Sequence, residues 1–165
     1  MRLYHGGTTI INKPKLVIPT RTYDFGNGFY MTQSEKQAKK YANIKMSQLN
    51  ENSQFVNVFN FDMFRAEREF SVLKLYEPNE VWLDFVCQNR YGLINDTYDV
   101  VIGCKIYSII SKYEKNILNK QQTMAAIKSA PLYEQIVIKN ESALALLTFC
   151  NAYDPRQISA ICYDN

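Results

Sequence analysis

Three short stretches of the chain hold residue types that could bind or transform a ligand. His5, the only histidine, precedes two glycines near the N-terminus. The stretch FGNGFYMT, residues 25–32, places two glycines before an aromatic pair. The stretch YEQIVI, residues 133–138, starts with a tyrosine followed by a carboxylate and an amide. Taken one at a time, each stretch is better explained by structure than by chemistry.

His5 alone would be interpreted as a histidine at the edge of the core with its imidazole hydrogen-bonded. The following Gly6 weakens that interpretation, because a glycine lets a ligand approach the backbone and bond its N–H and C=O groups. A nucleophile that depends on histidine would need His5 itself as its base, since the chain offers no other imidazole.

The stretch FGNGFYMT has three interpretations: a phosphate loop, a platform for a flat ligand, or a turn entering a strand. A phosphate loop is disfavoured, because a strong preceding strand, a third glycine and a Lys-Ser/Thr pair are all missing. Gly26 and Gly28 can supply the positive φ that a turn requires. Tyr41 follows Tyr30 by one strand end and about three helical turns. Both rings can therefore border one cleft and form a slot for a planar heterocycle, although Tyr41 alone would be a core residue.

The stretch YEQIVI alternates, so Glu134, Ile136 and Ile138 share one face of a strand and Gln135 lies on the other. If the isoleucines face inward, Glu134 sits at the buried mouth of its strand. A carboxylate there can bond a ribose hydroxyl and stabilise a developing cation. Alone, Glu134 would be interpreted as a strand-end residue that points to solvent.

Together the stretches resemble the ADP-ribosyltransferase superfamily, and within it the His-Tyr-Glu branch that includes diphtheria toxin and the poly(ADP-ribose) polymerases. LYHGGTTIIN is similar to that branch's Trp-His-Gly-Ser strand, FGNGFYMTQSEKQAKKYA to its Phe-Gly-x-Gly-Ile-Tyr-Phe segment and helix, and LYEQIV to its Glu-Tyr-Ile-Val strand. Residues 2–150 also resemble an uncharacterised bacterial domain family of the superfamily, through YDFGNGFY, VWLDFVCQNR, YDVVIG and EQIVIKNESAL. The resemblance implies one ADP-ribosyltransferase-like domain over residues 1–165.

The resemblance also implies NAD as co-substrate and gives each matching residue a role. His5 would bond the adenosine ribose, and Gly6 would bond the nicotinamide carboxamide through its backbone. Tyr30 and Tyr41 would sandwich the nicotinamide ring. Glu134 would bond the nicotinamide-ribose 2′-hydroxyl and favour the oxocarbenium-like state as nicotinamide leaves, which requires positioning and a nearby anion.

Two further positions, Thr8 and Ala38, belong to the implied NAD site. The branch often has a serine where this chain has Ala38, so one polar contact to the carboxamide is missing. In bacterial relatives the glutamine that matches Gln135 is the steadier residue, so the third catalytic residue is either Glu134 or Gln135. Arginine-modifying members carry Glu or Gln at the position of Leu132, which argues against an arginine acceptor.

Composition limits the alternatives. The chain has 165 residues, of which 47% are hydrophobic and 21% charged, as expected for one folded domain. A formal charge of +3 suits an anionic ligand but is too small to indicate DNA binding. The absence of long apolar runs and of a signal peptide predicts a cytoplasmic protein, or one delivered into a target cell's cytoplasm, without membrane contact. Four scattered cysteines are expected to be reduced thiols rather than a zinc site: Cys87, Cys104, Cys150 and Cys162.

Hydrophobic periodicity and capping signals predict the elements that position these residues. Strands are expected at residues 2–5, 16–18, 28–31, 55–62, 98–103, 133–138 and 156–163. Helices are expected from a Thr32–Glu35 capping box to about 48, at 79–91, 105–117 and 119–128, and from Asn140 to about 150. This order is not a regular βαβ repeat, and it favours α+β with a split, mixed β-sheet core flanked by helices.

Three hypotheses for function follow. The first is an NAD-dependent mono-ADP-ribosyltransferase, such as a bacterial toxin or effector, with NAD glycohydrolase as its nearest variant. The second is an inactive nucleotide- or partner-binding module of the same fold. The third is an RNA-directed activity, prompted by the basic balance and the many aromatic residues. The sequence does not identify the acceptor, which is a protein or a nucleic acid. It also leaves open whether a small partner protein neutralises or delivers this domain, which is expected to be complete in itself.

Overall fold

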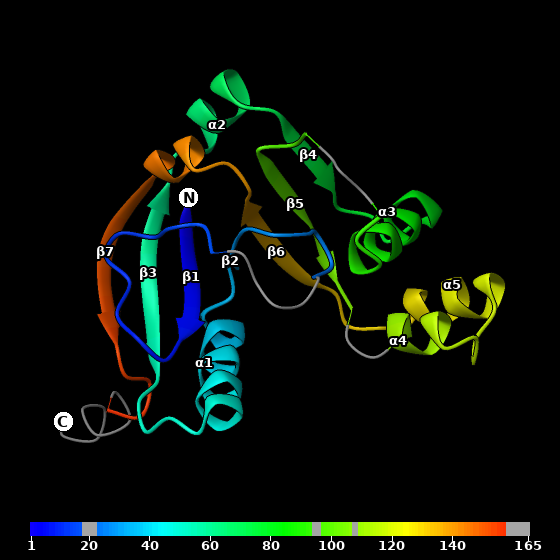
Figure 1. Cartoon of the computed structure of the whole chain (residues 1–165), viewed down its shortest axis with the longest axis horizontal. Helices are drawn as coiled ribbons and strands as arrows, with labels where there is room; N and C mark the ends of the chain where they lie inside the picture. Colours follow the sequence, from blue (N-terminus) through cyan, green and yellow to red (C-terminus); the bar gives the residue numbers. More distant parts are fainter. Residues whose placement is uncertain (18–22, 94–96, 107–108, 158–165) are drawn as a thin grey trace, which may run out of the picture.

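Two β-sheets form the framework of the protein (Figure 1). The computed structural model describes residues 1–17, 23–93, 97–106 and 109–157. The first sheet is antiparallel in the order β1-β3-β7, with β1 at Arg2–Gly7, β3 at Phe55–Phe61 and β7 at Leu147–Tyr153. The second is mixed in the order β2-β6-β5-β4, with β2 at Phe29–Met31, β6 at Tyr133–Ile138, β5 at Val100–Lys105 and β4 at Val72–Leu75. The chain is therefore α+β, as its sequence predicts.

Five α-helices, counted over the described residues, surround the sheets. They are α1 at Glu35–Leu49, α2 at Met63–Glu69, α3 at Glu80–Arg90, α4 at Ile109–Glu114 and α5 at Lys120–Lys128. Figure 1 shows α1 beside β1, and α3, α4 and α5 gathered beside the four-stranded sheet. The helix α3 also connects β4 to β5, which run parallel and therefore need such a crossover.

An isolated antiparallel bridge joins the two sheets between Tyr4 of β1 and Thr32, the residue after β2. The Tyr4 N–H donates to the Thr32 carbonyl at 2.9 Å, and the Thr32 N–H donates back at 3.0 Å. The chain then leaves for α1. Strands β1 and β2 thus lie side by side over a short stretch and separate beyond it.

Apolar side chains bury both faces of the four-stranded sheet. One face, with Ile102, Ile136 and Ile138, packs against residues of the three-stranded sheet such as Leu3 and Phe59. The other face packs against α3, α4 and α5, with Trp82, Leu83, Val86, Ile110 and Ile127 among the buried residues. Burial on two sides explains the uninterrupted apolar runs in β5 and β6.

The start of α1 differs from the sequence prediction. Ser34, rather than Thr32, is the N-cap, and its hydroxyl accepts from the Gln37 N–H at 3.3 Å. Thr32 is occupied by the bridge to β1, and its hydroxyl accepts from the Ser34 N–H at 3.1 Å. Glu35 instead pairs with Lys39 at 2.7 Å, so the predicted capping box is wrong.

The predicted helix from Asn140 to about 150 is also wrong. The Asn140 side chain accepts from the Ser142 N–H at 2.8 Å in a local turn, and only a short 3₁₀ segment, Ser142–Leu146, follows. Residues Leu147–Tyr153 form β7, which pairs with β3. Pairing with a partner strand far away in the sequence outweighs the local capping signal here.

Other differences are smaller. The segments α2 and β4 were not expected, and Lys105 belongs to β5 rather than to a helix. Val81 is exposed on α3 instead of facing inward. Leu16 and Val17 have no regular structure, while the rest of the strand expected at 16–18 lies outside the described residues. Residues 156 and 157 form a turn, and the remainder of the expected last strand lies outside the described residues.

Close packing of α1 on β1 makes Gly6 sensitive to substitution. A Cβ atom on Gly6 would lie 2.1 Å from the Ala38 carbonyl oxygen and 2.7 Å from the Ala42 nitrogen. Both are backbone atoms that cannot rotate away. We expect Gly6→Ala to lower the free energy of unfolding by about 1–3 kcal/mol, measured by urea denaturation.

Gly7→Ala is the matched control. Its Cβ would meet only the His5 side chain, at 3.4 Å, which is ordinary contact. We expect a change of less than about 1 kcal/mol. Equal losses for the two variants would contradict close helix–strand packing at Gly6.

Candidate active site

His5 connects the first and second stretches of the sequence. Its Nδ1 lies 2.7 Å from the carbonyl oxygen of Tyr30, and its ring stacks on Phe29 at 4.6 Å between centroids and 18° between planes. A carbonyl oxygen only accepts, so Nδ1 carries the hydrogen and Nε2 is left as an acceptor in the neutral ring. The side chain of His5 is therefore in direct contact with the backbone of Tyr30.

The backbone N–H and C=O groups of Gly6 point away from β3, toward the side of β1 on which β2 lies. Both backbone groups of Tyr4 turn to Thr32, and along an antiparallel strand this direction repeats at every second residue. The N–H and C=O groups of Gly6 consequently turn to the same side as those of Tyr4. In an antiparallel pairing Gly6 would face Tyr30, but the bridge between Tyr4 and Thr32 is isolated, and the Tyr30 carbonyl oxygen lies against His5 Nδ1 instead.

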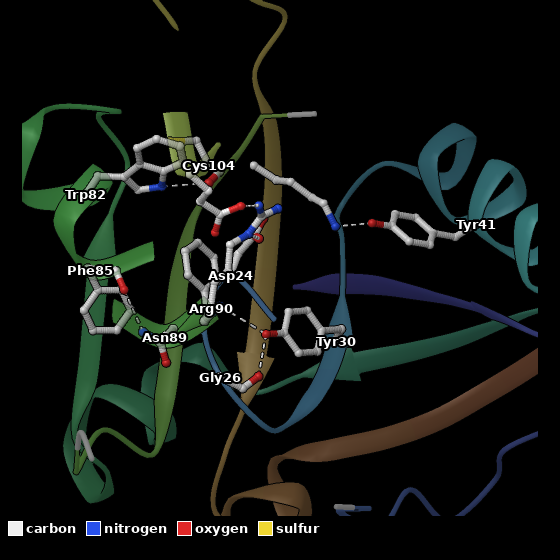
Figure 2. Close-up of polar contacts among 12 residues, drawn as sticks. Asp24, Gly26, Tyr30, Tyr41, Trp82, Phe85, Asn89, Arg90 and Cys104 are labelled. Atoms are coloured by element: carbon white, nitrogen blue, oxygen red, sulfur yellow. Dashed lines mark hydrogen bonds and ion pairs between the residues drawn. The ribbon is translucent and has the colours of Figure 1, made fainter. Parts of the chain in front are cut away.

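Tyr30 is fixed by its hydroxyl. The hydroxyl donates to the Gly26 carbonyl at 2.6 Å and accepts from the Phe25 N–H at 3.2 Å (Figure 2). Gly26 has φ of +77°, so its conformation favours glycine and forms the turn expected from the sequence. Burial raises the pKa of Tyr30 far above its ordinary value, and the nearby Asp24 charge adds to this increase, so the hydroxyl remains a neutral donor.

Tyr41 extends from α1 toward the four-stranded sheet. Its hydroxyl accepts a hydrogen bond from the Lys105 ammonium at the end of β5 (Figure 2). Tyr41 and Tyr30 therefore come from different elements and are held by different partners, Lys105 for Tyr41 and the Phe25–Gly26 backbone for Tyr30.

The third stretch lies beside Tyr30, but its two candidate residues face opposite sides. Tyr30 pairs directly with Val137, so Gln135 shares the face of the sheet that carries Tyr30. Gln135 is 6% exposed, and within the described part of the chain its Nε2 has no hydrogen-bond partner. Glu134 lies on the other face, partly exposed, and accepts from the Gln33 amide.

The remaining predicted positions differ in kind. Ala38 is 1% exposed and packs with Val56 and Val58 beneath α1. Its side chain is therefore covered and has almost no surface that a ligand could contact. Thr8 directly follows β1 and is partly buried. The structure therefore groups His5, Gly6 and Thr8 at the end of one strand, and keeps Ala38 in the core.

Sequence analysis missed a charged cluster beside Tyr30. Arg90 Nε donates to Asp24 Oδ1 at 2.7 Å, and Arg90 Nη1 donates to Glu114 Oε2 at 2.9 Å. Asp24 stands between two aromatic residues, and a charge in such surroundings is the signal that could have identified it. Lys105 was missed as well, because it was assigned to a helix.

Neither a metal site nor a membrane-spanning helix is present among the described residues. They contain no cluster of three His, Cys, Asp or Glu side chains that could hold a metal ion. No helix in these ranges has the length and apolar character needed to cross a membrane. A shallow surface hollow of about 540 Å³ lies elsewhere, between α3 and α5, and is lined by Glu80, Lys120 and Met124.

Comparison with known proteins gives one match. Residues 1–149 match the model of a family described as protein of unknown function (DUF3990). No curated protein and no solved structure matches the chain.

The single histidine allows a direct test of its environment. Burial lowers the pKa of His5 below its ordinary value of 6.5, and the positive charge of Lys45 acts in the same direction. The hydrogen bond to the Tyr30 carbonyl opposes this shift without cancelling it. We expect NMR titration of the one imidazole to give a pKa below 6.5; a value at or above 6.5 would contradict the buried, neutral ring.

The same shift predicts a pH dependence of stability. Because the folded pKa is below the unfolded one, the unfolded chain binds more protons as the pH falls through 6.5, and the free energy of unfolding decreases there. Carboxylates with lowered pKa, such as Glu35, lose their contributions only at more acidic pH. We expect His5→Gln to remove the decrease just below pH 6.5, measured by urea denaturation at several pH values.

Proposed function

The chain belongs to the family described as protein of unknown function (DUF3990), and we propose that it is an NAD-dependent mono-ADP-ribosyltransferase. In this proposal it transfers ADP-ribose from NAD to a macromolecular acceptor inside a cell, as a bacterial toxin or effector would. The fold proposed with it is the ADP-ribosyltransferase-like split core, in which the gap between β1 and β6 receives NAD.

The convergence of three distant stretches carries the proposal. His5 contacts Tyr30, the strand of Tyr30 pairs with β6, and β6 begins with Tyr133, Glu134 and Gln135. These are the stretches whose resemblance to the His-Tyr-Glu branch suggested NAD. A ligand shared by the three stretches requires them to lie close together. Composition and hydrophobic periodicity alone do not predict this proximity.

The available hydrogen-bonding groups fit the carboxamide of a flat heterocycle and a ribose. Gly6 offers one backbone donor and one acceptor on the side of the gap, which complement a carboxamide. His5 offers Nε2 as an acceptor for a ribose hydroxyl. Gln135 offers a buried donor that has no partner among the described residues, and such a group is costly unless something binds it.

The chain's own residues can assist cleavage of a glycosidic bond to a cationic leaving group. The hydroxyl of Tyr30 is held by a hydrogen bond and stays neutral. Its aromatic ring is therefore fixed and can hold a flat ring by stacking. The Glu134 carboxylate, at the open start of β6, can lie against the side where positive charge develops. Gln135, on the side of Tyr30, is suited to positioning. NAD supplies the reactive bond, and an acceptor nucleophile completes the transfer.

Release of free nicotinamide from NAD tests the proposal. We expect the purified protein to release it, and expect Tyr30→Ala and His5→Ala to reduce the rate. Glu134→Gln removes one negative charge and keeps the shape, and should lower kcat by roughly 10²–10³. Glu51→Gln, at an exposed glutamate after α1, is the matched control and should leave the rate unchanged.

Four outcomes discriminate among the alternatives. Absence of NAD binding at millimolar NAD would refute the proposed function. NAD binding without turnover would indicate a binding module. Labelled ADP-ribose that is attached only when lysate is present would identify a transferase and its acceptor, whereas release without attachment would identify a glycohydrolase. A parallel Gln135→Met variant shows whether Gln135, rather than Glu134, sets kcat.

A further inference from the structure

Two linked ion pairs connect distant segments of the sequence through charged side chains that the proposed chemistry leaves unused. Asp24 belongs to YDFGNGFY and Arg90 ends VWLDFVCQNR, two of the signatures that mark the resemblance. Their side chains meet at 2.7 Å, although 66 residues separate them. Arg90 continues the chain to Glu114 of α4 at 2.9 Å (Figure 2).

This cluster is largely withdrawn from solvent. The exposed fraction of the side chain is 7% for Asp24, 25% for Arg90 and 20% for Glu114. Ion pairs on the surface contribute little to structure, whereas one that is partly buried and hydrogen-bonded fixes geometry, because loss of one partner leaves an uncompensated charge. The Asp24–Arg90 pair therefore constrains where the backbone after Asp24 can lie.

That backbone is what holds Tyr30. The two residues after Asp24 are Phe25, whose N–H donates to the Tyr30 hydroxyl, and Gly26, whose carbonyl accepts from it. The turn is tightly enclosed as well, since a Cβ on Gly26 would lie 2.7 Å from Oδ1 of Asn89, the neighbour of Arg90. The end of α3 thus fixes the turn, and the turn fixes the phenol.

We propose that Arg90 is a positioning residue for Tyr30, and through Tyr30 for the flat ring of the ligand. This inference rests on the proposed function, because the ligand is taken to be NAD. Arg90 acts through Asp24 and the Phe25–Gly26 backbone and touches no reacting atom. Substitution of Arg90 should therefore weaken NAD binding only by changing the position of the Tyr30 hydroxyl.

A double-mutant cycle tests this inference. NAD affinity is measured by calorimetry for the wild type, Arg90→Met, Tyr30→Phe and the double variant. Tyr30→Phe removes the hydroxyl that the turn holds, while keeping an aromatic ring. We expect Arg90→Met to weaken binding about tenfold in the wild type, and to have little further effect in the Tyr30→Phe background. Additive effects of the two substitutions would overturn the inference.

Two other variants separate positioning from stability. Arg65→Met is the matched control, because Arg65 donates hydrogen bonds to a carboxylate as Arg90 does, here to Glu69 at an exposed position of α2, and should leave NAD affinity unchanged. Arg90→Lys keeps the charge but not the planar fork, so it should recover part of the affinity. If Arg90→Met does not fold, Asp24→Asn replaces it in the cycle. A purely structural role would lower the free energy of unfolding and leave the affinity of the folded protein unchanged, which would contradict the inference.

A measurement without NAD distinguishes failure of the inference from failure of the proposed function. The amide NMR signal of Phe25 reports its hydrogen bond to the Tyr30 hydroxyl. We expect Arg90→Met to shift this signal in the same direction as Tyr30→Phe. If the wild type binds no NAD, the proposed function fails, and the Phe25 signal alone decides whether Arg90 positions Tyr30. A signal that stays at its wild-type position in Arg90→Met would refute the positioning role.

Discussion

The short backbone bridge between Tyr4 and Thr32 is the constraint on which the arrangement of the site depends. Its two hydrogen bonds set the register of β1 against β2, so that His5 lies beside the Tyr30 carbonyl. A slip of one residue would turn His5 to the opposite face of its strand and remove this contact. The bridge is also isolated, so the ladder does not extend along β1 from Tyr4 to Gly6, which would otherwise face Tyr30.

Local sequence signals were sufficient to predict an element where its apolar pattern and the turn or cap residues beside it indicate the same structure. The strand at Tyr133–Ile138 was predicted with its observed bounds from its pattern of apolar residues. The strand ending at Met31 and the helix ending near Arg90 were predicted within one or two residues, from the glycines and caps beside them. The α+β class followed from the order of such elements.

Contacts between distant segments could not be derived in this way. The strand Leu147–Tyr153 depends on pairing with β3, and its sequence alone also suited a helix after Asn140. The pair of Asp24 and Arg90 depends on how α3 packs against a turn far from it in the sequence. For the candidate site, the individual residues were suggested by the three sequence stretches. The prediction that they form one site came from the family resemblance. Which of Glu134 and Gln135 faces Tyr30 required the sheet register.

The buried indole of Trp82 has a practical consequence. Its Nε1 donates at 2.9 Å to the carbonyl of Cys104, the residue before Lys105, and Lys105 in turn contacts Tyr41. Trp82 is the only tryptophan in the chain. Indole emission responds to the polarity and hydrogen bonding around the ring, so the native protein contains its own fluorophore at the end of β5. Its emission spectrum reports on this corner of the sheet without any attached dye.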